Sequence, residues 1–143
     1  MKLSHVLSAL NQIEKSKFIT CLDKLCSSAA PGDEVIAASD MYGGTYRLFM
    51  KVFEKFGLKF IYVDTTNPEN VKTAITANTK LIWIETPTNP LMNITDIKAV
   101  SVIAKEAGAL LCVDNTFASP YLQNPLDLGA DLVMHSATKY LGG

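Results

Sequence analysis

The sequence predicts an α/β protein built around a mainly parallel sheet. Two observations lead to this prediction. Short apolar runs of strand length alternate along the chain with longer segments whose apolar residues recur at helical spacing. Glycine, proline or asparagine marks most of the boundaries between them. Strands that alternate with helices form right-handed crossover units, and the strands of such units run parallel.

The expected elements follow one another from Glu34 onward. The predicted strands span 34–39, 58–63, 80–84, 109–113 and 132–134. A first helix is expected to open at Gly43-Gly44-Thr45, with Thr45 as a possible N-cap, and to end at Gly57. Its predicted buried face consists of residues spaced by four, namely Leu48, Val52 and Phe56.

Two further helices connect the later strands. Asn67 is expected to cap a short helix with Pro68 in its first position. The next helix is predicted over 94–107, with Gly108 after it. The residues expected to face the core are Val71, Ala74 and Ile75 in the first of these helices and Ile97, Val100, Ile103 and Ala104 in the second.

The predicted domain organisation has two parts. Residues 1–30 are expected to form an atypical, helical N-terminal segment, since Leu3, Val6, Leu7 and Leu10 recur there at helical spacing. The turn at Pro31-Gly32-Asp33 separates it from residues 31–143, which are expected to form part of a larger domain. The chain stops directly after its most polar turn, and a fragment of a longer protein is therefore expected.

Composition narrows the class of protein. A chain of 143 residues with 48% hydrophobic residues and a net charge of −1 is typical of one soluble globular unit with a core. The balanced charge gives no reason to expect nucleic acid or an anionic membrane as partner. No apolar run is long enough to span a bilayer, and the N-terminus lacks a signal-peptide pattern. Three cysteines without a C-x-x-C motif indicate reduced thiols and a cytoplasmic location.

Polar residues gather directly after the predicted strands. They include Tyr42, Glu85, Asp114 and Lys139, each from a different turn. The carboxyl ends of parallel strands share one edge of a sheet, where cofactor crevices form. Three of these residues also have a structural interpretation: Asp114 as a turn cap, Tyr42 as part of a plain tight turn, and Lys139 as a solvated surface residue.

The residue types favour pyridoxal 5'-phosphate (PLP) over a nucleotide or a metal. The chain has neither G-x-G-x-x-G nor G-x-x-x-x-G-K-[ST], and its two histidines are isolated. A PLP site needs a lysine for the Schiff base, a carboxylate for the pyridine nitrogen, an aromatic ring to stack on the pyridine, and hydroxyls for the phosphate.

Four motifs closely resemble the trans-sulfuration PLP enzymes, the group of cystathionine γ-synthase, cystathionine γ-lyase, cystathionine β-lyase and methionine γ-lyase. The motifs are Tyr42-Gly43-Gly44-Thr45-Tyr46-Arg47, Glu85-Thr86-Pro87-Thr88-Asn89-Pro90, Val113-Asp114-Asn115-Thr116-Phe117-Ala118-Ser119-Pro120 and Ser136-Ala137-Thr138-Lys139-Tyr140. Their order and spacing match the family from about Pro31 to Gly143. The resemblance is closest to the γ-synthase and γ-lyase members.

The resemblance implies a role for each cofactor residue. Lys139 would form the Schiff base and then move the α-proton of the substrate. Asp114 would pair with the pyridine nitrogen, and Tyr42 would stack on the ring and assist as acid or base. Ser136 and Thr138 would bind the phosphate.

Three more residues are implied near the substrate. Arg47 matches an arginine that shapes the substrate pocket. Asn89 matches a residue near the 3-hydroxyl of the cofactor and the carboxylate of the substrate. Glu85 matches a glutamate near the same pocket. The implied activity is elimination or replacement that breaks or forms a C–S bond, with cystathionine, O-acylhomoserine, cysteine or homocysteine as the amino-acid substrate.

The resemblance also shows what this chain lacks. It implies an incomplete three-layer α/β/α large domain of the aspartate-aminotransferase type (PLP fold type I) and a homotetramer with shared active sites. The helix-starting Ser-Ser-Gly-Met turn of the family is reduced here to Ser27-Ser28-Ala29-Ala30. The N-terminal arm and the C-terminal domain of the family, which complete the phosphate and carboxylate sites, have no counterpart. A catalytically inactive fragment is therefore the alternative function.

Overall fold

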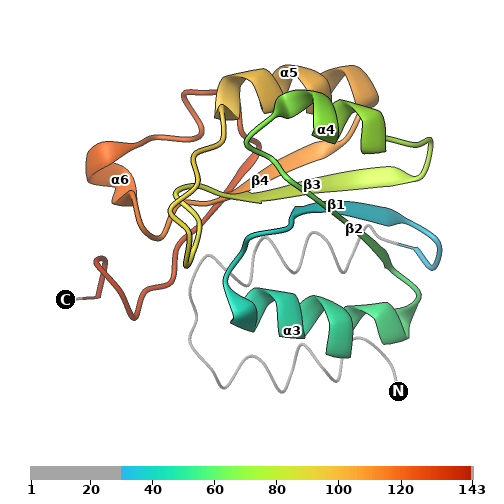
Figure 1. Ribbon diagram of the computed structural model, residues 1–143, viewed down its shortest axis with the longest axis horizontal. Coiled ribbons are helices and arrows are strands. Elements are labelled where there is room, and N and C mark those ends of the chain that lie inside the picture. Colours follow the sequence, from blue (N-terminus) through green and yellow to red (C-terminus); the bar gives the residue numbers. More distant parts are fainter. Residues whose placement is uncertain (1–29, 143) are drawn as a thin grey trace.

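A computed structural model describes residues 30–142 of the chain. Their core is a five-stranded sheet in the order β2-β1-β3-β4-β5, in which every neighbouring pair is parallel (Figure 1). The strands are β1 (Glu34–Ala38), β2 (Lys59–Val63), β3 (Thr79–Glu85), β4 (Leu110–Asp114) and β5 (Leu132–Met134). The predicted parallel α/β sheet is therefore confirmed, and all five predicted strands are present.

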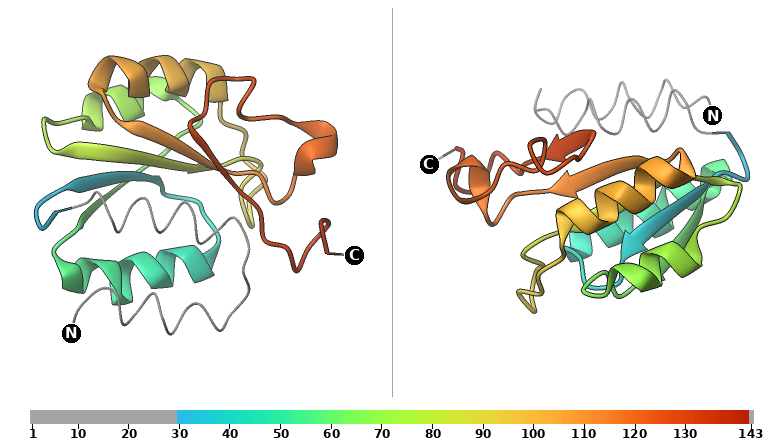
Figure 2. Two further views of the ribbon diagram at one scale, coloured as in Figure 1. Left: turned by 180° about the vertical axis from the view of Figure 1, so that it is seen from behind. Right: turned by 90° about the horizontal axis from the view of Figure 1, so that it is seen from above.

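Helices cover both faces of the sheet. They are α3 (Gly43–Lys51), the 3-10 helix η1 (Phe53–Phe56), α4 (Pro68–Ala74), α5 (Ile97–Ala107) and the short α6 (Ser119–Leu122). Helices α4 and α5 lie together on one face and α3 lies on the other, so that the sheet forms the middle of three layers (Figures 1 and 2).

Strand residues alternate between two cores, as the period-two geometry of a strand requires. Ala37, Trp83 and Cys112 face α3 and η1, whereas Ile36 and Val113 face α4 and α5. Cys112 is fully buried in the first core, as its position within an apolar run predicts. Because both faces of the inner strands are buried, these strands read as continuous apolar runs.

The predicted buried face of the first helix is wrong. Leu48, Val52 and Phe56 are only partly buried, although Leu48 packs against the core, whereas Phe49 and Phe53 are at most 1% exposed. The two sets lie one residue apart, and both keep the four-residue spacing, so periodicity alone does not choose between them. The aromatic rings decide, because Phe49 stacks on Phe60 at 4.6 Å and meets the edge of Trp83 at 5.4 Å.

Helix boundaries depart from the predictions at three places. The N-cap position of α3 is Tyr42 and not Thr45, which is buried inside the helix. Helix α5 begins at Ile97, because the carboxylate of Asp96 accepts the N–H of Ala99 and caps it. Helix α6 was not predicted, since its four residues are too few to show a period.

Other boundaries agree with the sequence. The side chain of Asn67 accepts the N–H of Glu69 and caps α4, with Pro68 in the first turn. The predicted end of the first helix at Gly57 is only partly right, because α3 already ends at Lys51 and Gly57 ends the following η1, in the left-handed region at φ 89°. The predicted helical segment at 1–30 lies, apart from Ala30, outside the described residues. Within residues 30–142, no helix is long and apolar enough to cross a membrane.

Candidate functional site

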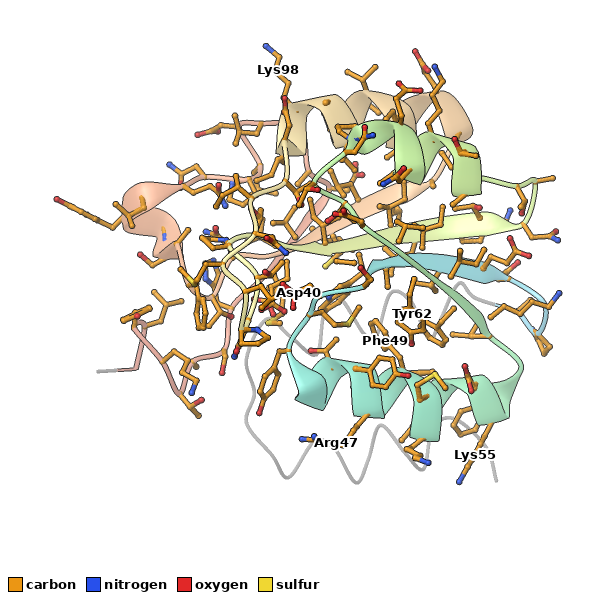
Figure 3. The ribbon with its side chains drawn as sticks, in the orientation of Figure 1. Asp40, Arg47, Phe49, Lys55, Tyr62 and Lys98 are labelled. Atoms are coloured by element: carbon orange, nitrogen blue, oxygen red, sulfur yellow. The ribbon has the colours of Figure 1, made fainter. Side chains whose placement is uncertain are left out.

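The carboxyl ends of β1, β3, β4 and β5 bring four loops to one edge of the sheet (Figure 1). These loops carry the polar residues that the sequence singles out. Figure 3 shows Asp40, which follows β1, at the edge where the loops gather, whereas Lys98 projects from α5 away from the body of the molecule. The loops that carry the predicted site residues therefore lie on one side of the fold.

Two acidic residues end neighbouring strands at this edge. Glu85 and Asp114 are register partners across β3 and β4, and each is 4% exposed. Oε2 of Glu85 accepts the main-chain N–H of Tyr42 at 2.7 Å, and the backbone of Asn89 also hydrogen-bonds this carboxyl group. Glu85 thus contacts two loops that carry other predicted site residues.

Burial disfavours the charged form of both carboxyl groups. It raises the pKa of Glu85 from 4.5 to about 7, and the charges of Asp114 and Asp40 act in the same direction, whereas the hydrogen bonds from Tyr42 and Asn89 oppose it. Burial also raises the pKa of Asp114, against the hydrogen bonds from Thr116. Two carboxyl groups at adjacent strand ends are therefore held at a site where a cationic group would be stabilised.

Glu85→Gln is expected to stabilise the cofactor-free chain at pH 8 and to have little effect near pH 4. The folded-state pKa is raised, so the wild type loses stability as the pH rises from 4.5 through about 7. The expected gain at pH 8 is at most about 3.5 kcal/mol, because the pKa rises from 4.5 to about 7 and each pH unit corresponds to about 1.4 kcal/mol, and solvent screening of the carboxyl group lowers it. Denaturant unfolding at both pH values measures it, with Glu106→Gln as the exposed control. An equal effect at both pH values would contradict the assignment.

A chain of hydrogen bonds links Asp114 to the last turn. Both N–H and Oγ1 of Thr116 donate to Oδ1 of Asp114, at 3.0 and 2.6 Å. Oγ1 of Thr116 then accepts the N–H of Ser136 at 2.9 Å, and the hydroxyls of Ser136 and Thr138 lie 2.9 Å apart. Asp114 therefore does cap a turn, as its structural interpretation predicts, and the same turn connects it to the segment that carries Lys139.

The remaining predicted residues lie nearer the surface. Lys139 is exposed, and Tyr42 is 51% exposed. Arg47 is exposed on α3, and its Nη1 would lie 3.5 Å from a Cβ at Gly43, at the start of that helix. Asn89 is half-buried in the loop after β3. The structure thus joins Tyr42, Asn89 and Glu85 in one group, and Asp114, Ser136 and Thr138 in another.

Sequence reasoning missed two parts of this edge. Thr116 links the groups of Asp114 and Ser136, and its place two residues after an aspartate is a turn signal that would have identified it. The carboxylate of Asp40 accepts hydrogen bonds from Oγ1 of Thr88 and from Nδ2 of Asn93, at 3.1 Å for the latter. Since 48 positions separate Asp40 from Thr88, no local pattern could reveal this contact.

A cavity lies beside the predicted site. It is lined mainly by the segment around α6 and by β5, and none of the predicted site residues contributes to its wall. Asn115 borders it and is fully buried, where its side chain exchanges two hydrogen bonds with Gln123, at 2.9 and 2.8 Å. Across residues 30–142, no group of three or more His, Cys, Asp or Glu side chains could hold a metal ion.

Comparison with known proteins identifies the group to which these motifs belong. A family model described as Cys/Met metabolism PLP-dependent enzyme matches residues 13–143. The chain belongs to this family. The resemblance inferred from the motifs begins at about Pro31, whereas the family model also matches residues 13–30. The resemblance stated from the four motifs is thereby confirmed, and PLP is the cofactor of the family.

Individual relatives agree with this assignment. The chain is 59% identical over 112 residues to a cystathionine γ-lyase of Bacillus subtilis and 57% identical over 112 residues to a cystathionine β-lyase of Lactococcus lactis. Each alignment covers 78% of this chain and 30% of the relative. The crystal structure of metB from Corynebacterium glutamicum matches 90% of this chain and 33% of that chain, with a TM-score of 0.84 and 52% identity. The chain therefore spans about a third of the length of its relatives.

Proposed function

We propose that this chain supplies the cofactor-binding part of a PLP-dependent trans-sulfuration enzyme, which eliminates or replaces a group at a C–S bond of a sulfur amino acid. The observation that carries the proposal is the hydrogen-bonded connection from Asp114 through Thr116 to Ser136 and Thr138. It ties a buried acid to a pair of hydroxyls in the turn that also carries Lys139.

The chemistry of these groups fits the cofactor. When bound, PLP supplies an electron sink for the carbanion formed at the substrate. Asp114 would hold a proton at the pyridine nitrogen, and its raised pKa supports this role because a cationic partner repays the cost of its buried charge. The hydroxyls of Ser136 and Thr138 would donate hydrogen bonds to the phosphate, and the exposed ring of Tyr42 would cover the pyridine face.

The remaining residues would act on the substrate. The amine of Lys139 would attach the cofactor and afterwards move the α-proton, and its exposure leaves it accessible for both tasks. Arg47 and Asn89 are proposed to orient the substrate, with Arg47 contributing the positive charge that an amino-acid carboxylate needs. Cystathionine is the proposed substrate, since the names of the relatives include cystathionine lyases and synthases.

The proposal extends to the location and assembly of the whole protein. We infer a cytoplasmic homotetramer with shared active sites, for which the exposed apolar side chains of Leu91, Met92 and Ile94 offer contact area. They follow the Glu85 to Pro90 loop directly, at the edge of the sheet that carries the site.

A PLP titration tests the proposed function. Visible absorbance of the purified chain should saturate at one cofactor per chain, and the loaded chain is then assayed for release of a thiol from cystathionine. Lys139→Ala should abolish the spectral change, whereas Lys98→Ala, on the exposed side of α5, should leave it intact. Uptake without thiol release would favour the alternative, a cofactor-binding fragment without activity. Absence of any saturable uptake would contradict the proposal.

Gly44→Ala is expected to weaken PLP binding, whereas Gly43→Ala is not. A Cβ at Gly44 would lie 2.3 Å from Cε1 of Tyr42, so the ring must leave its position. A Cβ at Gly43 would meet only Nη1 of Arg47, at an ordinary 3.5 Å. Loss of most of a stacking contact costs roughly 1 kcal/mol, or about fivefold in affinity. Equal affinities of the two variants in the same titration would argue against a stacking role of Tyr42.

A further inference from the structure

Glu85 joins two loops that are distant in sequence. Its carboxyl group lies at the end of β3 and accepts the N–H of Tyr42, 43 positions earlier, in the turn between β1 and α3. The backbone of Asn89, in the loop after β3, also hydrogen-bonds it. One buried side chain therefore fixes the main chain at two predicted site residues that belong to different loops.

The turn at Tyr42 depends on this contact. Tyr42 is the N-cap residue of α3, and its own side chain makes no capping hydrogen bond. Its carbonyl accepts the N–H of Tyr46, but its own N–H points to Oε2 of Glu85 at 2.7 Å. A charged acceptor forms a stronger hydrogen bond than a neutral one, and a negative charge at a helix N-terminus is favourable. Ionised Glu85 therefore holds this turn more firmly than neutral Glu85.

We propose that Glu85 is a positioning residue, which places the ring of Tyr42 and the backbone of Asn89 for the cofactor according to its own charge state. The inference rests on the proposed function for the identity of the cofactor, and on the hydrogen bonds above for the geometry. It assigns Glu85 a role through Tyr42 and Asn89, in place of direct contact with substrate.

The surroundings of Glu85 make its charge state adjustable near neutral pH. The negative charges of Asp114 on β4 and of Asp40 after β1 raise the pKa of Glu85, as does its burial. The backbone hydrogen bonds of Tyr42 and Asn89 lower the same pKa. A cation bound at Asp114 would remove part of the repulsion and favour ionised Glu85. Binding of a cationic ring at Asp114 would thereby tighten the turn that carries Tyr42.

The geometry is tested first without any cofactor. In ¹H–¹⁵N NMR spectra of the wild-type chain, the amide protons of Tyr42 and Asn89 should shift with pH about a common midpoint near 7. The amide of Glu106, exposed on α5, serves as reference. The two shifts should vanish in Glu85→Gln, which keeps the size of the side chain but cannot ionise. Separate midpoints, or a titration of Tyr42 that persists in the variant, would overturn the proposal.

The link to the cofactor is tested by a double-mutant cycle on PLP affinity at pH 8. Glu85→Gln should weaken binding by about tenfold, as expected for loss of a charge-assisted hydrogen bond. Tyr42→Ala should have a smaller effect in the Glu85→Gln background than in the wild type, because the ring is then already displaced. Additive effects would overturn the positioning role. If the wild type binds no PLP, the proposed function fails, while the NMR titration still decides the geometry.

Discussion

Asp114→Asn is expected to weaken PLP binding by about a hundredfold and, at the same time, to stabilise the cofactor-free chain. The amide cannot carry the charge that would hold a proton at the pyridine nitrogen, and a buried charge-assisted hydrogen bond is worth up to about 3 kcal/mol. Its effect on stability has the opposite sign. Burial raises the pKa of Asp114, so the ionised wild type carries a desolvation cost that the neutral amide avoids.

The pH dependence separates these two effects. Because the folded-state pKa of Asp114 is raised, the wild type loses stability as the pH rises from the unfolded-state value through the folded-state value. The gain in Asp114→Asn should therefore appear above that window and disappear below it. Denaturant unfolding and PLP titration of the same samples measure both quantities, with Asp127→Asn as the exposed control. A variant that both binds PLP like the wild type and is less stable would contradict the role of Asp114.

Phe49→Ala is expected to lower the free energy of unfolding by about 3 to 5 kcal/mol, the usual cost of removing a buried phenyl ring. Phe49 is fully buried and contacts three aromatic rings, those of Phe53, Phe60 and Trp83. Figure 3 shows its ring and that of Tyr62 in the layer between α3 and the sheet. Loss of this ring opens a cavity in the layer that positions α3, and hence Tyr42.

Val52→Ala is the matched control for this prediction. Val52 belongs to the face that the sequence predicts to be buried, but it is only partly covered. Its replacement should cost about 1 kcal/mol or less. Thermal or denaturant unfolding of both variants decides between the two faces. A larger loss of unfolding free energy in Val52→Ala than in Phe49→Ala would favour the buried face predicted from the sequence.

The sheet could be predicted from sequence because each inner strand is buried on both faces. Such strands are short apolar runs that end at polar residues, and the runs ending at Glu85 and Asp114 show this clearly. The buried face of α3 could not be predicted in the same way. Two sets of apolar residues with equal spacing compete there, and the choice depends on rings contributed by other strands, such as Trp83.

The candidate site was likewise predictable only in part. Residues at strand ends could be predicted, since a parallel sheet brings its carboxyl ends to one edge. The contacts among them could not, because Tyr42 meets Glu85 and Asp40 meets Thr88 across more than 40 positions of chain. Thr116 is intermediate, as its turn with Asp114 is local but its bond to Ser136 spans 20 positions.

The most direct test of the proposed site is the location of the covalently held cofactor. The PLP-loaded chain is reduced with borohydride, digested, and analysed by mass spectrometry for the lysine that carries the pyridoxyl group. The proposed site predicts one modified peptide, containing Lys139, whose labelling is reduced in Asp114→Asn. Modification of Lys55, Lys98 and other exposed lysines to a similar extent would contradict a specific cofactor site at the ends of β4 and β5. Full labelling of Lys139 in the Asp114→Asn variant would contradict it as well.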